Sequence, residues 1–246
     1  MAFDVNNILL KYEKSVIIKD EETKYLHYPS ESDTLIVCFT TLGPHIYERV
    51  RMFWEESEVW KYNFLFISDN NGKHSGQYYL GAYPKREIET ITSTIIDKIV
   101  RGNGIKNIIT IGSSMGGYAA IYYAIKYNFL GALSVVPQVN ESIINEFGWL
   151  KWKETVNEIG GLPSLITMIN EADSLPNIFF QNGTYKADEV AGELIFEHLN
   201  KKNGFFIHDK FDKNDHTSDF LSKELSFSIF EVFLSIVRTR DKGGIH

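Results

Sequence analysis

The chain has 246 residues, which is long enough for one large α/β domain with a sizeable core. Hydrophobic residues make up 43% of it and charged residues 23%, proportions typical of a soluble globular protein. The formal net charge of −7, without a basic stripe, argues against binding to the phosphate backbone of nucleic acids.

The first 30 residues contain three short apolar segments, which predict antiparallel strands at one edge of a sheet. These segments are ILLKYE (8–13), SVIIKD (15–20) and KYLHY (24–28). No charged leader followed by an apolar stretch precedes them, and no run of about 18 apolar residues occurs anywhere. We therefore expect no signal peptide, no membrane span and a cytoplasmic location.

Six further apolar runs are short, rich in β-formers and bounded by polar residues, glycine or proline, which is typical of buried parallel strands. Cys38 lies inside the first of these runs and is predicted to fill the core. It is the only cysteine, so the chain can form neither an internal disulfide nor a zinc site built of cysteines. The runs span residues 34–40, 63–68, 107–112, 132–137, 177–183 and 204–211.

Helical periodicity fills the intervals between these runs. REIETITSTIIDKIVRGNG carries an isoleucine stripe and predicts a helix that ends at Gly102 and Gly104. Helices are also predicted in MGGYAAIYYAIKYN, in ADEVAGELIFEHLNKKNG and over residues 217–238. Strands that alternate with helices predict an α/β fold, with a mostly parallel sheet covered on both faces. In the last helix, the residues expected to face inward are Phe220, Phe227, Phe230, Leu234 and Val237.

One segment, residues 139–172, interrupts the alternation and carries Trp149 and Trp152 in helical spacing. We interpret it either as an insertion that forms a lid over one end of the sheet or as plain helical packing. Because the chain shows no repeat, low-complexity segment or linker, we expect a single domain over residues 1–246 with this insertion. A phosphate-binding glycine loop and a metal-ligand cluster are also missing, so neither cofactor nor metal is expected.

The stretch ITIGSSMGGYAAIYYAI (109–125) places two serines among glycines, between a predicted strand and a predicted helix. The pattern G-x-S-x-G fits in one register only, with Ser114 at its centre and Gly112 and Gly116 on either side. In a nucleophile elbow, the serine occupies a strained strand-to-helix turn that lifts its hydroxyl above the sheet. The alternative is a glycine-rich turn that only packs the helix against the strand.

These residues resemble the α/β-hydrolases. More narrowly, ITIGSSMGGYAAIYYAIKY followed by VVPQ, together with FLFISDNNGKHSGQYYLG (64–81), resembles hydrolase-like proteins of bacterial polysaccharide loci and accessory secretion systems. The similarity covers roughly residues 34–220. It implies the α/β-hydrolase fold and a catalytic serine followed along the chain by an acid and then a histidine.

Three histidines follow the serine before the C-terminal tail. A serine hydroxyl needs a base within hydrogen-bond reach, usually a histidine. His198 lies in a predicted helix and His208 in the last predicted strand, whereas His216 lies in the loop after that strand, where the resemblance places the base. We therefore favour His216.

The acid is less clearly marked, because the positions two to four residues beyond the strand NIFFQNG hold no carboxylate. The first candidates are Asp188 and Glu189, and we favour Asp188, which also suits the N-cap of the next helix. Asp215 is adjacent to His216 and is poorly placed to orient its ring.

An oxyanion hole is expected to pair two backbone N–H groups. One belongs to Met115, at the start of a helix whose dipole favours negative charge. The other follows the strand 34–40, and Thr41 is favoured by its position. Residues 69–78 follow another strand end, where open α/β sheets bind ligands, and either line the pocket or form a solvated loop.

Two functions are consistent with these residues. The first is a serine esterase that forms an acyl-enzyme on Ser114, with O-acyl groups on a bacterial glycan as the substrate that the resemblance implies. Acyl transfer to a sugar hydroxyl uses the same nucleophile and stays open. The second is a hydrolase-like scaffold or acyltransferase partner in the export of surface polysaccharide or glycoprotein, which the poorly marked acid motivates.

Overall fold

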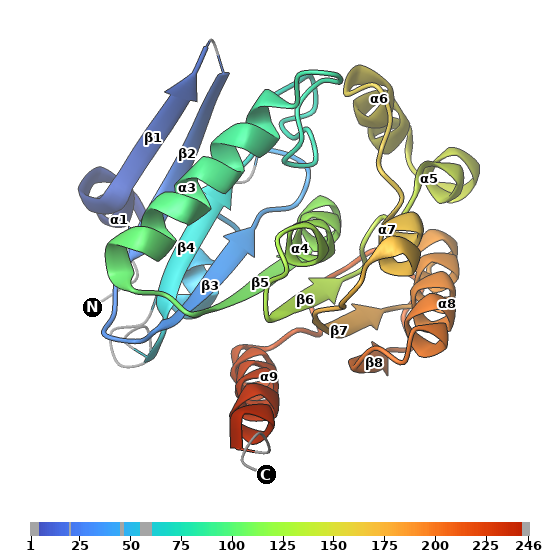
Figure 1. Ribbon diagram of the computed structural model, residues 1–246. Coiled ribbons are helices and arrows are strands. Elements are labelled where there is room, and N and C mark those ends of the chain that lie inside the picture. Colours follow the sequence, from blue (N-terminus) through green and yellow to red (C-terminus); the bar gives the residue numbers. More distant parts are fainter. Residues whose placement is uncertain (1–4, 20, 45–46, 55–60, 243–246) are drawn as a thin grey trace.

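A single eight-stranded sheet runs through the computed structural model, which describes residues 5–19, 21–44, 47–54 and 61–242 (Figure 1). The strand order is β1-β2-β4-β3-β5-β6-β7-β8. The six runs predicted as buried strands all form strands, with ends shifted by up to two residues. The strands are β1 (Glu13–Ile18), β2 (Glu21–Tyr28), β3 (Thr34–Phe39), β4 (Asn63–Ser68), β5 (Asn107–Ser113), β6 (Gly131–Val135), β7 (Asn177–Asn182) and β8 (Phe206–Lys210).

The sheet is mostly parallel, as predicted. Only β1 and β2 run antiparallel to their neighbours, and the six strands from β3 to β8 are parallel to one another. From β3 the chain moves outward to β4 and then returns past β3 to β5. The order of the strands therefore reverses at β3, and the loops at the carboxyl ends diverge there to leave room for a site.

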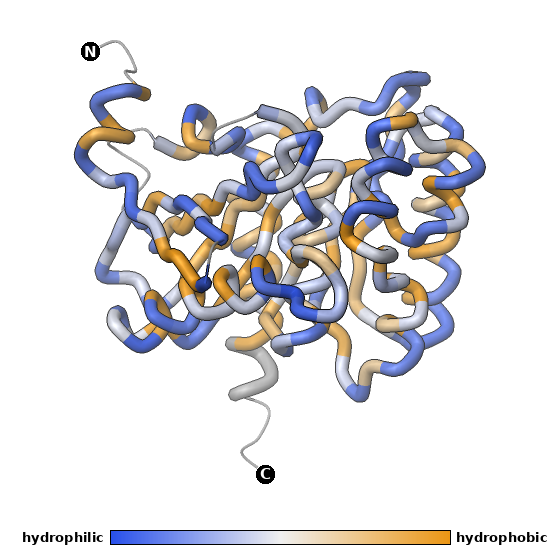
Figure 2. The backbone as a smooth tube through the Cα atoms, turned by 90° about the horizontal axis from the view of Figure 1, so that it is seen from above, coloured by the Kyte–Doolittle hydropathy of each residue, from blue (hydrophilic) through white to orange (hydrophobic). Residues whose placement is uncertain are grey.

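Helices cover both faces of the sheet (Figure 1). One face packs against α3, α4 and α8, with the shorter α5, α6 and α7 alongside, and the other packs against α1, α2 and α9. In Figure 2, hydrophobic stretches run through the middle of the molecule, and most of the hydrophilic stretches lie toward its periphery. The helices are α1 (Val5–Tyr12), α2 (Val50–Phe53), α3 (Glu87–Asn103), α4 (Met115–Lys126), α5 (Glu141–Phe147), α6 (Leu150–Glu158), α7 (Leu165–Glu171), α8 (Lys186–Lys201) and α9 (Lys223–Lys242).

Two predictions for single elements were wrong. ILLKYE (8–13) was expected to be an edge strand, but residues 5–12 form α1, because a short apolar run fits a helix as well as a strand and Ile8 is buried from a helix. The last helix begins at Lys223, not at 217, so Phe220 lies in the preceding loop, 46% exposed, and stacks on Phe211. Other features match: the isoleucine stripe of α3 and Cys38 are buried.

Residues 139–172 are helical and form α5, α6 and α7 between β6 and β7. This part of the molecule lies beside α8, away from β1 and β2 (Figure 1). Within the described ranges, no helix combines the length and the apolar character needed to cross a membrane.

An aromatic cluster fixes α9 to the sheet. Phe230 is fully buried and its ring lies within 6.2 Å of the rings of Phe53, Tyr62 and Phe227, measured between centroids. Val232, two residues further along the same helix, is 36% exposed.

We expect Phe230→Ala to lower the free energy of unfolding by about 3–5 kcal/mol, because it leaves a cavity that the surrounding rings fill only in part. The exposed Val232→Ala should change it by about 0.5 kcal/mol or less. Urea unfolding followed by tryptophan fluorescence measures both. Equal effects of the two variants would contradict a core built around Phe230.

Candidate active site

The turn between β5 and α4 is strained at Ser114. Its backbone has φ 54° and ψ −119°, although it is not a glycine. Such a conformation costs energy and persists only where its surroundings hold it. Here the Ser114 N–H donates to the carbonyl of Val135 on β6, at 2.9 Å, and the Ser114 carbonyl accepts from the N–H of Tyr118 in α4, at 3.0 Å.

The two glycines of the G-x-S-x-G pattern allow the strand and the helix to cross at close range. A Cβ atom on Gly112 would lie 2.2 Å from the carbonyl oxygen of Gly116. A Cβ atom on Gly116 would lie 2.7 Å from the carbonyl oxygens of Phe39 and Thr40, at the end of β3. Both distances are shorter than any real contact, so only glycine fits at either position.

Ser114, His216 and Asp188 form one row of hydrogen bonds. The Oγ atom of Ser114 lies 2.8 Å from Nε2 of His216. The Nδ1 atom of His216 lies 2.7 and 2.9 Å from the two carboxylate oxygens of Asp188. His216 comes from the loop between β8 and α9, and Asp188 from the first turn of α8. The structure therefore brings together the three residues selected from the sequence.

The carboxylate of Asp188 is not a helix cap. The N-cap of α8 is Tyr185, which makes no side-chain capping bond, and Asp188 contacts His216 instead. Burial raises the pKa of Asp188 above its usual range, and the hydrogen bond from His216 opposes this shift. A histidine that donates to a buried carboxylate is held in one tautomer, with Nδ1 protonated and Nε2 free to accept a proton.

The other candidate residues lie elsewhere. His208 contacts the amide oxygen of Asn182 through Nε2, at 2.7 Å, and stacks on a phenylalanine of β7. His198 contacts Asn170. Glu189 accepts from Lys210, at 2.9 Å, on the surface of α8. These three side chains bond to Asn182, Asn170 and Lys210 and not to Ser114, so they belong to the packing of the sheet edge and of the helices.

A further polar side chain, which is not among the residues selected from the sequence, reaches the serine. Gln138 is 4% exposed, and its Nε2 donates to Oγ of Ser114 at 2.8 Å. It lies three residues beyond the end of β6, and β6 is the neighbour of β5 in the sheet. Gln138 could have been identified from the sequence by its position, because it follows the carboxyl end of β6, the strand beside the one that leads to Ser114.

The two expected oxyanion donors differ in their surroundings. Met115 is fully buried at the first position of α4, directly after Ser114. The N–H of Thr41, in contrast, donates to the Oε2 atom of Glu48 at 3.2 Å. The neighbouring N–H of Thr40 donates to the hydroxyl of Tyr79 at 2.7 Å. The Thr41 N–H is thus available to a ligand only when the Glu48 side chain moves.

Ser113 faces away from this row of hydrogen bonds. Its hydroxyl accepts a hydrogen bond from the guanidinium of Arg49, which is buried on the other side of the turn. The two adjacent serines therefore have different partners, Ser114 in the site and Ser113 in the packing beneath it. Arg49 is a second contact that sequence reasoning did not reveal.

An aromatic group surrounds the histidine. The rings of Trp149, Trp152 and Tyr185 lie 5.3, 4.7 and 6.2 Å from the His216 ring, between centroids. Trp152 is buried, whereas Trp149 is 39% exposed. Both tryptophans come from the helical segment 139–172, which therefore contributes directly to the walls around His216.

Residues 69–78 have a partly structural role. The buried carboxylate of Asp69 accepts from the backbone N–H groups of Gln77 and Tyr79, at 2.7 and 2.8 Å, and so shapes the loop. His74 contacts Glu154 of α6, which joins this loop to the helical segment.

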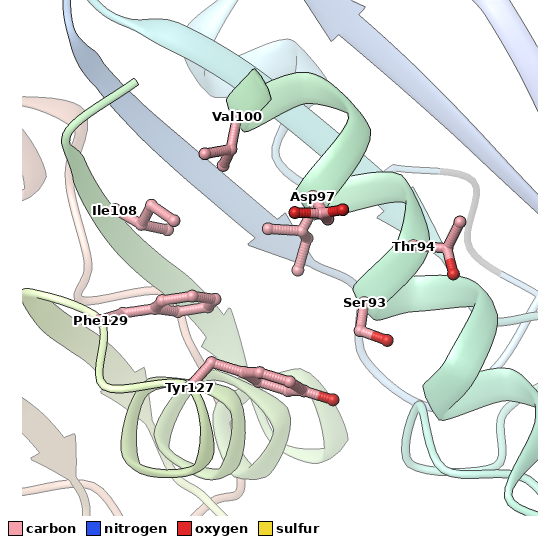
Figure 3. A pocket seen from close by; sticks show the side chains of 8 residues that line it. Ser93, Thr94, Asp97, Val100, Ile108, Tyr127 and Phe129 are labelled. Carbon is pink, nitrogen blue, oxygen red and sulfur yellow. The ribbon is translucent and has the colours of Figure 1, made fainter. Parts of the chain in front are cut away.

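The hollow shown in Figure 3 lies away from Ser114. It has a volume of about 450 Å³ and is lined by residues of α3 and by Ile108, Tyr127 and Phe129. Ile108 is at the start of β5 and Ser114 just beyond its end, so six residues of extended chain, about 20 Å, separate them. Apolar side chains dominate this hollow, and it contains none of the polar residues gathered around Ser114.

The described residues contain no group of three or more histidine, cysteine or acidic side chains arranged to hold a metal ion.

No protein family model and no curated protein matches the sequence, but solved structures match the fold. The glycosylation-associated Gap123 complex of Streptococcus agalactiae aligns with a TM-score of 0.68 and 19% identity, over 95% of this chain and 47% of that one. The present chain thus spans about half the length of that protein chain.

Two other structures match over nearly their whole length. The capsule O-acetyltransferase of Neisseria meningitidis serogroup A, in complex with CoA, has a TM-score of 0.62 and 19% identity, over 95% of this chain and 97% of that one. The fluorophosphonate-binding serine hydrolase F of Staphylococcus aureus has a TM-score of 0.63 and 13% identity, over 90% and 97%. With the strand order described above, these similarities show that the chain has the α/β-hydrolase fold.

We expect Gly116→Ala to lower the free energy of unfolding by about 1–3 kcal/mol, because the added methyl group overlaps backbone atoms of β3. Gly102→Ala is the matched control, since a Cβ atom there meets nothing within 4 Å. The control should be neutral or stabilise α3 by about 0.5–1 kcal/mol. Chemical denaturation of both variants measures the difference, and a neutral Gly116→Ala would show that the crossing is not tightly packed.

Proposed function

We propose that this protein is a serine esterase that forms an acyl-enzyme on Ser114. The observation that carries the proposal is the row of hydrogen bonds from Ser114 through His216 to Asp188. An unaided serine hydroxyl is a weak nucleophile at neutral pH, and a histidine at 2.8 Å supplies the base that it needs. The strained turn presents the hydroxyl at the carboxyl edge of the sheet.

The geometry supports a two-step reaction. In the first step, Oγ of Ser114 attacks the ester carbonyl carbon while its proton passes to Nε2 of His216, and Asp188 holds the resulting imidazolium in place. The leaving alcohol takes that proton when the tetrahedral intermediate collapses. In the second step, His216 removes a proton from the incoming hydroxyl group, whose oxygen attacks the carbonyl carbon of the acyl-enzyme. When this second tetrahedral intermediate collapses, the C–Oγ bond breaks and His216 returns the proton to Oγ of Ser114.

The negative charge of the intermediate needs donors. The N–H of Met115 is the first donor of this proposal. Met115 is the first residue of α4, a helix of 12 residues whose dipole favours an anion at this end. Thr41 is the second donor of this proposal, and it serves in the state in which Glu48 has released its N–H.

For the substrate, we propose an O-acyl group carried by a bacterial glycan. The exposed Trp149 beside His216 offers an aromatic face of the kind against which the C–H groups of a sugar ring pack. Two structures with this fold support this choice by their names, which are those of a capsule O-acetyltransferase and of a glycosylation-associated protein. In this proposal the helical segment 139–172 acts as a lid that carries the aromatic wall.

Acyl transfer to a sugar hydroxyl is a second candidate, favoured by the similarity to the acetyltransferase that binds CoA. It uses the same first step and differs in the group that attacks the acyl-enzyme. The other candidate, a hydrolase-like scaffold in the export of polysaccharide or glycoprotein, is motivated by the poorly marked acid in the sequence. The contact between Asp188 and His216 removes that motive, and the similarity to a protein of a glycosylation complex is what remains in its favour.

Ser114→Ala should abolish labelling by a fluorophosphonate probe and lower kcat for short-chain p-nitrophenyl esters by about 10⁴–10⁶-fold. Ser113→Ala should leave the labelling intact and change the rate by less than about tenfold, because Ser113 contacts Arg49 and not His216. Peptide mapping of the labelled protein identifies the modified residue. A phosphonyl group on Ser113, or on neither serine, would overturn the assignment.

His216→Ala should lower kcat by about 10³-fold or more, since the serine loses its base. Asp188→Asn should lower it by about 10²–10⁴-fold, since the imidazolium loses its orienting charge. The matched controls are His208→Ala and Glu189→Gln, which alter side chains outside the row. Steady-state kinetics on one ester compares all four, and a loss at His208 equal to that at His216 would move the base to β8.

A further inference from the structure

The chain enters the site a second time through a strained turn after β6. Val136 has φ 41°, a conformation that a β-branched residue adopts only when its surroundings enforce it. Its N–H donates to the carbonyl of Gln181 on β7 at 2.8 Å, which holds the turn to the sheet. Pro137 follows, and then Gln138, whose buried side chain reaches Ser114.

The direction of the hydrogen bonds follows from Asp188. Its carboxylate accepts from Nδ1 of His216, so in the neutral imidazole, the form that acts as a base, Nε2 carries no hydrogen and accepts from the Ser114 hydroxyl. The oxygen of Ser114 then has only lone pairs to offer on its other side. Gln138 must therefore present its Nε2–H group, and not its carbonyl, to Ser114.

The other end of the same amide is unoccupied. The Oε1 atom of Gln138 is buried and has no hydrogen-bond partner among the described residues. Buried polar atoms are normally paired, so an unpaired one that lies beside a nucleophile indicates a group that meets a ligand. Among the described residues, Ser114 is the one hydrogen-bond partner of the Gln138 side chain, so no other protein group holds the Nε2–H donor when Ser114 reacts.

We propose that Gln138 is a further catalytic residue, a side-chain donor of the oxyanion hole. This inference rests on the esterase proposed above. When Oγ bonds to the carbonyl carbon, the electron pair of the C=O bond moves to the carbonyl oxygen, and the Oγ proton goes to His216. The charged oxygen is then two bonds from Oγ, within reach of an N–H group that lay 2.8 Å from Oγ before the attack.

The surroundings of Thr41 explain why such a donor is needed. Glu48 accepts from the Thr41 N–H and also from the hydroxyl of Ser218, at 3.4 Å, so its carboxylate is held from two sides. The Thr40 N–H is occupied by Tyr79. Gln138 needs no such rearrangement. The negatively charged oxygen that it would bind exists only once the tetrahedral intermediate begins to form. A donor of this kind stabilises the transition state more than the bound ester.

The test compares Gln138→Met with Gln181→Met in the full chain. Methionine has nearly the length of glutamine and lacks its N–H group. Gln181 is equally buried at the end of β7, also has an unpaired Oε1 atom, and contacts Asp209 instead of Ser114. We expect Gln138→Met to lower kcat/KM for p-nitrophenyl acetate by about 10²-fold, mostly in kcat, while Gln181→Met stays within about threefold of the wild type.

A second readout separates an oxyanion donor from a merely structural residue. Sulfur accepts hydrogen bonds weakly, so a thionoester gains little from the hole, and the wild type should prefer the ester over the matching thionoester. Gln138→Met should reduce this preference by about the same 10²-fold. Gln138→Glu, which keeps the shape, should lose more activity than Gln138→Met because its charge opposes that of the oxyanion.

The failure of this inference can be distinguished from the failure of the proposed esterase activity. If the probe labels Ser114 in both variants, and Gln138→Met keeps the rate and the ester preference of the wild type, Gln138 is not a donor and the esterase stands. An unlabelled Ser114 in the wild type overturns the esterase, and this inference with it. If Gln138→Met does not fold, as judged from its thermal unfolding, Gln138→Glu decides by the same two readouts.

Discussion

The close crossing of β5 and α4 at Ser114 is the constraint on which the candidate site depends. Without side chains at Gly112 and Gly116, the helix starts within contact distance of the strand end and of the last carbonyls of β3. The backbone bonds of Ser114 to Val135 and Tyr118 hold the residue at a positive φ. The two serines at this turn have different partners, since Ser114 meets His216 and Ser113 meets Arg49.

Around this turn, the parallel sheet gathers groups from distant parts of the chain. Ser114, Gln138, Asp188 and His216 follow the carboxyl ends of β5, β6, β7 and β8, which are adjacent in that order. Parallel strands bring these ends to one edge, and each strand contributes one side chain. The row of hydrogen bonds is thus a consequence of strand order, and its precision comes from burial, since Ser114, Gln138 and Asp188 are all nearly inaccessible to solvent.

The helical segment 139–172 adds apolar walls to this polar row. Trp149 and Trp152 stack on each other, with centroids 4.7 Å apart, and approach the His216 ring at an angle. Apolar rings around an imidazole keep water away from it, which strengthens its hydrogen bonds to Ser114 and Asp188. On the far side, Glu48 connects the loop after β3 to the loop that carries His216, through Thr41 and Ser218.

The sequence by itself determined the sheet strands, most of the helices and the turn at Ser114, because these depend on local periodicity and on glycines at fixed spacing. It also pointed to His216 and Asp188 through their places after successive strands. It misjudged residues 8–13, where a short apolar run fits more than one structure, and Phe220, because the last helix begins six residues later than expected. Only the tertiary structure decided that Asp188 contacts His216, that Gln138 reaches Ser114 and that Glu48 occupies the Thr41 N–H, because these contacts join segments whose distance in space depends on the packing of the whole sheet.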